Sequence, residues 1–273
     1  MRIIDPHVHI WVNDPAFPWP AEKGNPPEDD RSAEMLLELM ETNGVAQTVL
    51  VHPIHYLWDN SYVTYAVNKY PDKFMGVGRL NPEDPAAPDH ASMWMEKGLH
   101  GMRLSPSGDG ENDWFDGPLM APIFARLESL GVPLLMLTGA KRLPRLAQLM
   151  DQHPNLQVCI DHMASVHPDD AEGRQALLDL ARYPQVFVKI SHTWTLSHEG
   201  YPWRDTYDQV EAIYQTFGAD RIMWGTDWPV CLSKAEYAQA LTVVRDEMKF
   251  IAPQDLEWVL GKTVLRLWDF DAK

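Results

Sequence analysis

The sequence predicts a single α/β domain with the (βα)₈, or TIM barrel, fold. Eight short apolar segments alternate with amphipathic segments along the 273 residues, and such alternation is typical of βα units that form a parallel sheet. The length also fits, because a barrel of this kind usually has about 250 residues. An open, doubly wound sheet is the alternative. However, the first apolar segment is not followed by the Gly-x-Gly-x-x-Gly motif that many such sheets carry.

The eight predicted strands are mostly apolar from end to end. Val49-Leu50-Val51 and Pro133–Leu137 show little alternation, which is typical of parallel strands that are buried on both faces. The predicted strands are Arg2–Ile10, Gln47–Pro53, Phe74–Leu80, Leu99–Leu104, Pro133–Thr138, Leu156–Asp161, Val186–Ser191 and Arg221–Thr226.

The predicted helices carry apolar residues at helical spacing. Ser32–Asn43 places four of them on one stripe, and Gly44 suits the position that follows a helix. The pattern repeats in Pro118–Leu130, which ends before Gly131. The other predicted helices are Ser61–Lys69, Ala87–Lys97, Arg142–His153, Pro168–Arg182, Thr206–Phe217 and Lys234–Lys249, with Pro253–Trp268 as an extra C-terminal helix.

Long irregular segments follow three of the predicted strands. They are Trp11–Asp30, Ser105–Gly117 and His192–Trp203. In a barrel these long βα loops would lie at the C-terminal face, where barrel enzymes have their active sites. We see no linker or repeat, so residues 1–273 are predicted to form one domain.

Composition excludes several classes of partner. The net charge of −16 argues against binding to nucleic acid or an anionic membrane, which need clustered basic residues. Two cysteines form neither a disulfide framework nor a thiolate zinc site. Without a leader or a long apolar run, we expect a cytoplasmic protein that acts on a small molecule. Whether it forms a homo-oligomer is left open.

The strongest functional signal is the pair His7 and His9 near the end of the first predicted strand. Residues two apart on a strand face the same side, so both imidazoles can reach one metal ion or one substrate oxygen. The last predicted strand is followed by Asp227. If the sheet closes into a barrel, this carboxylate becomes a neighbour of the two histidines.

Further polar residues follow other predicted strands, and we predict that several of them bind substrate. Six of the eleven histidines lie at or just beyond strand ends, which scattered histidines would rarely do. An arginine at a strand end can bind a substrate carboxylate through its planar fork of donors. The alternative is that it forms a structural ion pair within the protein. The tryptophans in the predicted loops either line an apolar pocket for the ligand or pack the long loops onto the top of the barrel. The predicted substrate-binding residues are His52, Asn60, Arg103, Lys189, His192 and Trp228, and His162 is a predicted catalytic residue.

Three motifs together resemble the amidohydrolase superfamily. They are His7-Val8-His9, Asp161-His162 and Gly225-Thr226-Asp227-Trp228-Pro229. The resemblance is greatest to the amidohydrolase-related branch, which contains lactonases for sugar lactones, pyrone dicarboxylate and muconolactone-type rings, and also decarboxylases. Asp59-Asn60, Arg103 and Lys189 also look like the lactonase group.

The resemblance implies at most one divalent metal ion. Two-metal members carry a Lys or Glu on strand four, where this chain has Arg103, and single-metal members take a histidine from strand five, which Leu134–Thr138 lacks. The remaining ligands are His7, His9 and Asp227, enough for one Zn²⁺ or Mn²⁺. Metal-independent activity is left open.

The resemblance implies a hydrolase that opens a small lactone ring, with a carboxylate on the substrate held by Arg103. Asp227 would activate water as a general base, and His162 would help to polarise the carbonyl. One alternative is a metal-dependent, non-oxidative decarboxylase of an aromatic or muconate-type acid, with His162 as the acid. A second is a binding barrel without catalytic activity.

Overall fold

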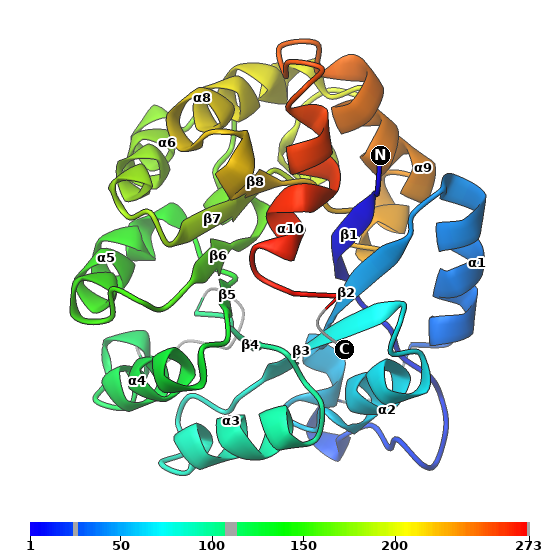
Figure 1. Ribbon diagram of the computed structural model, residues 1–273, viewed down its shortest axis with the longest axis vertical. Coiled ribbons are helices and arrows are strands. Elements are labelled where there is room, and N and C mark those ends of the chain that lie inside the picture. Colours follow the sequence, from blue (N-terminus) through cyan, green and yellow to red (C-terminus); the bar gives the residue numbers. More distant parts are fainter. Residues whose placement is uncertain (24–26, 107–113, 272–273) are drawn as a thin grey trace.

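The computed structural model describes residues 1–23, 27–106 and 114–271, and they form the predicted barrel. Eight parallel strands follow one another around the sheet in chain order (Figure 1). Between the first and last strands, the His9 amide donates to the Trp228 carbonyl and the Asp227 amide donates to the His7 carbonyl, at 2.7 and 2.8 Å. The strands are β1 Ile4–Val8, β2 Gln47–Val51, β3 Phe74–Arg79, β4 Met102–Leu104, β5 Leu134–Met136, β6 Val158–Ile160, β7 Val186–Lys189 and β8 Ile222–Met223.

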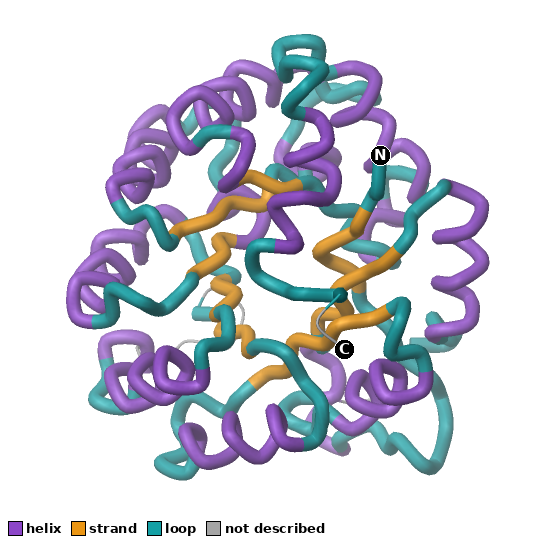
Figure 2. Tube along the Cα trace, viewed as in Figure 1, coloured by secondary structure: helices purple, strands orange, loops and turns teal. Residues whose placement is uncertain are grey.

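Helices surround the strands as an outer ring (Figure 2). Two of them end as the sequence predicts, since Gly44 and Gly131 follow their helices with φ of 69° and 65°, a left-handed conformation that glycine adopts without a steric penalty. The helices are α1 Ala33–Asn43, α2 Ser61–Lys69, α3 Ala87–Glu96, α4 Met120–Leu130, α5 Leu143–Gln152, α6 Ala171–Leu178, α7 Thr193–Leu196, α8 Tyr207–Phe217, α9 Tyr237–Thr242 and α10 Thr263–Leu265.

Three predicted helices are less regular than their apolar spacing indicates. Pro168–Arg182 divides into α6 and a 3₁₀ turn, Asp179–Arg182, and Lys234–Lys249 becomes α9 followed by a π-helical turn, Val243–Glu247. The C-terminal helix consists of a π-helical turn, Trp258–Lys262, and the single turn α10.

The C-terminal segment covers the N-terminal end of the barrel. Trp268 donates through Nε1 to the carbonyl of His100, just before β4, and Thr263 donates to the carbonyl of Ala219, just before β8. Val264 and Leu267 pack in one cluster with residues of the barrel interior. The C-terminal end of the barrel is therefore the open mouth. Within the described ranges, no helix combines the length and apolar character that crossing a membrane requires.

Candidate active site at the barrel mouth

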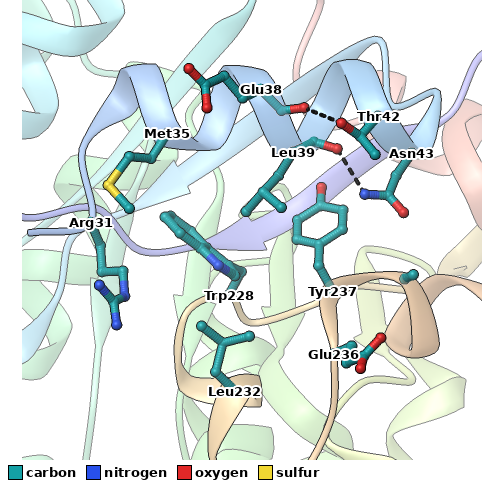
Figure 3. A pocket seen from close by; sticks show the side chains of 11 residues that line it. Arg31, Met35, Glu38, Leu39, Thr42, Asn43, Trp228, Leu232, Glu236 and Tyr237 are labelled. Atoms are coloured by element: carbon teal, nitrogen blue, oxygen red, sulfur yellow. Dashed lines mark hydrogen bonds between the residues drawn. The ribbon is translucent and has the colours of Figure 1, made fainter.

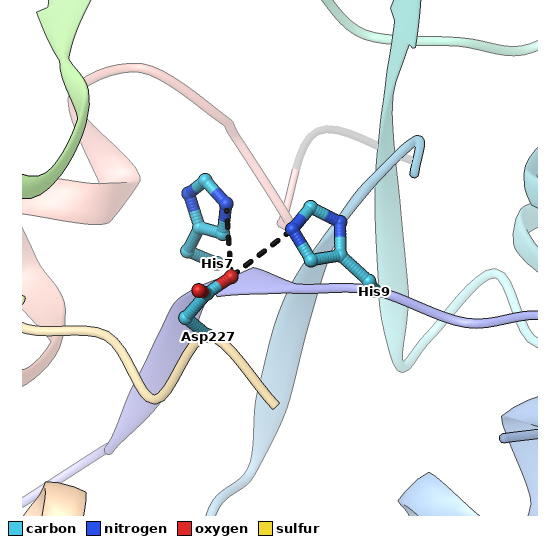
Figure 4. A group of neighbouring side chains, drawn as sticks. All are labelled: His7, His9 and Asp227. Carbon is cyan, nitrogen blue, oxygen red and sulfur yellow. Dashed lines mark ion pairs between the residues drawn. The ribbon is translucent and has the colours of Figure 1, made fainter. Parts of the chain in front are cut away.

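His7, His9 and Asp227 meet at the C-terminal mouth, as the sequence predicts. Nε2 of His9 lies 3.0 Å from Oδ1 of Asp227, and Nε2 of His7 lies 3.5 Å from the same oxygen (Figure 4). One ligand atom from each residue lies within 4.8 Å of the other two. The two histidines come from β1 and its end, and the carboxylate from the turn after β8, so closure of the barrel assembles the group.

The backbone around this group adopts an uncommon conformation. His162, His192 and Asp227 have φ values of 52°, 65° and 55°, a region that few residues other than glycine adopt. They account for three of the eight non-glycine residues with positive φ in the described part of the chain. His162 is the second residue of a 3₁₀ turn, Asp161–Ser165, and the three residues after it in this turn are also left-handed. Strain of this kind concentrates at functional sites, which supports an active site at this mouth.

Asp227 is held by histidines on both of its oxygens. Oδ1 faces His9 and His7, while Oδ2 accepts a short hydrogen bond from Nε2 of His192. The His192 ring stacks on that of His162, with centroids 3.6 Å apart and an interplanar angle of 9°. Nδ1 of His162 lies 2.8 Å from Oγ of Ser191. The carboxylate is thus oriented from two sides.

A second buried carboxylate, Asp161, anchors a network of charges beside His7. Its Oδ2 accepts from Nε of Arg103 at 2.8 Å, and its Oδ1 lies 3.0 Å from Nζ of Lys189 and 3.3 Å from Nδ1 of His7. Lys189 also contacts Nδ1 of His7 at 2.9 Å. Asp161, Lys189 and His7 have no exposed surface, so the network is shielded from solvent.

Both carboxyl groups are ionised at neutral pH. Burial alone would raise the pKa of Asp227, but the neighbouring charge of His192 and the hydrogen bonds from His192 and His9 outweigh it and hold the pKa well below 3.8. Burial likewise opposes ionisation of Asp161, yet Lys189, His7 and Arg103 keep its pKa well below the ordinary value. Asp227 is therefore a carboxylate that can accept a proton.

Two of the histidines, His7 and His162, are neutral at neutral pH because burial and neighbouring positive charges lower their pKa values. Burial, together with the charge of Lys189, lowers the pKa of His7 to about 3. Burial and the neighbouring His192 and His7 place the pKa of His162 well below 6.5. Neutral imidazoles can serve as metal ligands, as acceptors or as donors, depending on which ring nitrogen holds the proton.

A cavity of about 200 Å³ opens directly onto this group. Five of the predicted site residues line it together with apolar side chains, which suits a small, partly apolar ligand. The lining residues are His9, Trp11, Pro53, Ile54, His55, Arg103, Ser105, Leu137, His162, His192, Asp227 and Val230.

Four predicted substrate-binding side chains do not line this cavity, and one of them, Lys189, lies in the buried network beside His7. His52 is buried, with Nε2 3.2 Å from the carbonyl of Leu57. Asn60 bonds both the amide and the carbonyl of Arg79, at 2.7 and 3.0 Å. The indole of Trp228 lines a separate groove of about 680 Å³ between α1 and the segment 232–238 (Figure 3). Direct substrate binding by these four residues stays a prediction that the lining of the cavity does not support.

Sequence reasoning assigned no role to two residues that the structure brings into the site. Asp161 joins Arg103 and Lys189 into one network, and Ser191 contacts His162. A signal for Asp161 was present, because an acidic residue directly after the apolar strand Val158–Ile160 needs buried partners. The two basic residues on neighbouring strands are those partners.

Comparison with known families agrees with this geometry. The Amidohydrolase family model matches residues 4–270, which is nearly the whole chain. The chain belongs to the amidohydrolase family. The resemblance inferred from the His-x-His, Asp-His and Asp-Trp-Pro motifs is thus confirmed at the family level.

Curated relatives of this amidohydrolase act on lactones, according to their names. An L-fucono-1,5-lactonase of Burkholderia ambifaria is 29% identical over 238 residues, covering 83% of this chain and 80% of the relative. A 4-sulfomuconolactone hydrolase of Hydrogenophaga intermedia is 26% identical over 229 residues, covering 82% and 74% of the two chains.

A solved structure shares the fold. An amidohydrolase from Burkholderia multivorans, crystallised with bound zinc, superposes with a TM-score of 0.80 at 22% identity, covering 98% of this chain and 99% of that one. At this identity the match supports the barrel architecture across the whole chain.

Proposed function

We propose that this amidohydrolase opens the ring of a small lactone by attack of a water molecule, activated by Asp227, on the lactone carbonyl carbon. The observation that carries the proposal is the position of Asp227, an ionised carboxylate on the wall of the cavity with histidines on both of its oxygens. The names of the two curated relatives support the substrate class. Arg103, on the wall of the same cavity, favours a lactone that carries a carboxylate.

The reaction needs one group that accepts a proton and returns it. Asp227 takes a proton from water as the water oxygen bonds to the lactone carbonyl carbon. When the tetrahedral intermediate collapses, the ring C–O bond breaks and Asp227 returns the proton to the leaving oxygen. When Nδ1 of His162 accepts from Oγ of Ser191, 2.8 Å away, Nε2–H of His162 is the donor for the developing oxyanion.

The residues present also fit one divalent cation. Nδ1 of His9 lies 2.6 Å from the carbonyl of Val51, which can only accept, so Nε2 is the nitrogen left to bind a cation. Nε2 of His7 is buried and has no hydrogen-bond partner within the described ranges. We propose that His7, His9 and Asp227 would hold the ion. A Zn²⁺ or Mn²⁺ bound there would supply Lewis-acid polarisation of the carbonyl.

We expect at most one divalent ion per chain, because the cluster offers three ligands and Arg103 stands on β4 where a second ion would need an anionic ligand. A three-ligand shell also predicts incomplete loading after purification. Elemental analysis of the purified protein, combined with anomalous scattering from crystals, measures both quantities. Two ions per chain would contradict the ligand assignment.

Replacing Arg103 by Met should weaken binding of carboxylated lactones and leave uncharged lactones nearly unaffected. The expected loss is about 1.5–3 kcal/mol, the usual contribution of a hydrogen bond to a charged group. The KM values of matched acidic and neutral lactones measure it. Equal losses for both would mean that Arg103 acts through its ion pair with Asp161 and not on the substrate.

A panel of substrates tests the proposed activity itself. Sugar 1,5-lactones, muconolactone-type rings and aromatic carboxylic acids are incubated with the protein, and both acid release and CO₂ release are followed. The proposal expects acid release from at least one lactone. Release of CO₂ without lactone hydrolysis would favour the decarboxylase alternative, and neither product would favour a binding protein.

A further inference from the structure

We infer that Lys189 fixes the position of the proton on His7, and that this lowers the affinity of the His7–His9–Asp227 site for a divalent cation. The first half concerns the metal-free protein alone. The second half rests on the metal site proposed above. Lys189 thereby acts as a positioning residue, in place of the substrate contact that the sequence predicts.

The contact between Lys189 and His7 determines which ring nitrogen holds the proton for as long as the contact persists. Nζ of Lys189 lies 2.9 Å from Nδ1 of His7, and neither side chain has exposed surface. An ammonium group has three donors and no acceptor. Nδ1 of His7 must therefore accept, and the single proton of the neutral ring lies on Nε2.

That arrangement opposes metal binding by His7. Nε2–H points toward Oδ1 of Asp227, 3.5 Å away, whereas a metal ligand must present a lone pair at Nε2. For His7 to bind a cation through Nε2, its proton has to move to Nδ1, where Oδ1 of Asp161 is the acceptor at 3.3 Å. The ring carries one proton in both forms, so the shift changes its position and not its charge. Lys189 and Asp161 thus compete for the same nitrogen.

His9 provides an internal contrast on the same strand. Its Nδ1 lies 2.6 Å from the carbonyl of Val51, and a carbonyl can only accept. His9 therefore donates through Nδ1, and its Nε2, 3.0 Å from Oδ1 of Asp227, is the nitrogen left to bind a cation. Nδ1 is therefore a donor in His9 and an acceptor in His7, although both histidines belong to the same His-x-His motif.

Charge acts in the same direction as the hydrogen bond. Lys189 and Arg103 both contact Asp161, so the buried cluster beside His7 contains two cations and one anion. Arg103 bonds the other oxygen of this carboxylate, Oδ2, and no contact between Arg103 and His7 is observed in the described part of the chain. Arg103 therefore offers a matched control that removes one cation from the cluster without removing the donor to His7.

Nitrogen NMR of metal-free protein labelled with ¹⁵N-histidine tests the first half, since long-range correlations distinguish protonated from unprotonated ring nitrogens. His7 should be protonated on Nε2 and His9 on Nδ1, with the His7 signals assigned from a His7→Gln variant. In Lys189→Met the His7 proton should move to Nδ1, whereas in Arg103→Met it should stay on Nε2. Nδ1 protonation of His7 in the wild-type protein would overturn the inference, and this spectrum requires no folded Lys189 variant.

Chelator competition with Zn²⁺ tests the second half. Lys189→Met should bind Zn²⁺ more tightly than wild type, on the order of tenfold, as expected for a partner that orients a metal ligand, and the gain in Arg103→Met should be smaller. Equal gains would assign the effect to charge and overturn the tautomer explanation of affinity. No Zn²⁺ binding by any variant would overturn the metal site while leaving the NMR result and the lactone assay as separate tests.

Discussion

Replacing Asp227 by Asn should reduce turnover on the lactone substrate by about 10²–10⁴-fold, the usual contribution of a general base. The amide keeps the size of the carboxylate but cannot take a proton from water. It also cannot accept hydrogen bonds on both terminal atoms, so the contact with either His9 or His192 is lost. Steady-state kinetics, with circular dichroism to verify the fold, measure the effect.

The same substitution on the outer surface provides the control. Asp208 lies in the first turn of α8 and is exposed, so Asp208→Asn should leave turnover unchanged. Near-normal turnover in Asp227→Asn would show that another residue activates the water. His192 would then be the first candidate, since it lines the cavity and contacts Asp227.

Replacing Asp161 by Leu should lower the free energy of unfolding by about 3–5 kcal/mol, because loss of one partner leaves buried charges without compensation. Lys189 has no exposed surface and Arg103 is almost fully buried, and both rely on this carboxylate. Urea denaturation measures the loss. The pKa of Asp161 is held well below 3.8, so its stabilisation is present above about pH 4 and is lost as pH falls through the folded-state pKa.

A double variant tests whether the loss in Asp161→Leu comes from the unpaired charges and not from the changed shape of the side chain at position 161. Asp161→Leu combined with Lys189→Met removes one of the two unpaired cations, so it should be more stable than Asp161→Leu alone. A loss below about 1 kcal/mol in Asp161→Leu, within the range typical of exposed ion pairs, would contradict the importance of this network for folding.

The barrel could be predicted because its strands and helices repeat a simple pattern. What the pattern could not predict are the places where tertiary contacts replace regular pairing. The last strand, predicted as Arg221–Thr226, is limited to Ile222–Met223. Beyond it, the Trp224 amide donates to the carbonyl of Val259 and its indole donates to the carbonyl of Ile4. These partners are set by the C-terminal segment and not by the local sequence.

The site was predictable where strand geometry fixes the direction of a side chain. His7 lies within β1 and Asp227 directly faces it across the barrel closure. His52 lies one residue beyond β2, where the following loop determines where the ring points, and it turns toward the carbonyl of Leu57. The stacking of His192 on His162 depends on two left-handed residues, which no sequence pattern of non-glycine residues indicates.

The most direct test of the central claim is one turnover of the lactone substrate in H₂¹⁸O, followed by mass spectrometry of the product. Attack of Asp227-activated water at the carbonyl carbon places one ¹⁸O in the new carboxylate and none in the new hydroxyl group. That labelling, present with the wild-type protein and lost at the same time point with Asp227→Asn, is the predicted result. Label in the hydroxyl group, or loss of CO₂ from the substrate, would contradict hydrolysis at the lactone carbonyl.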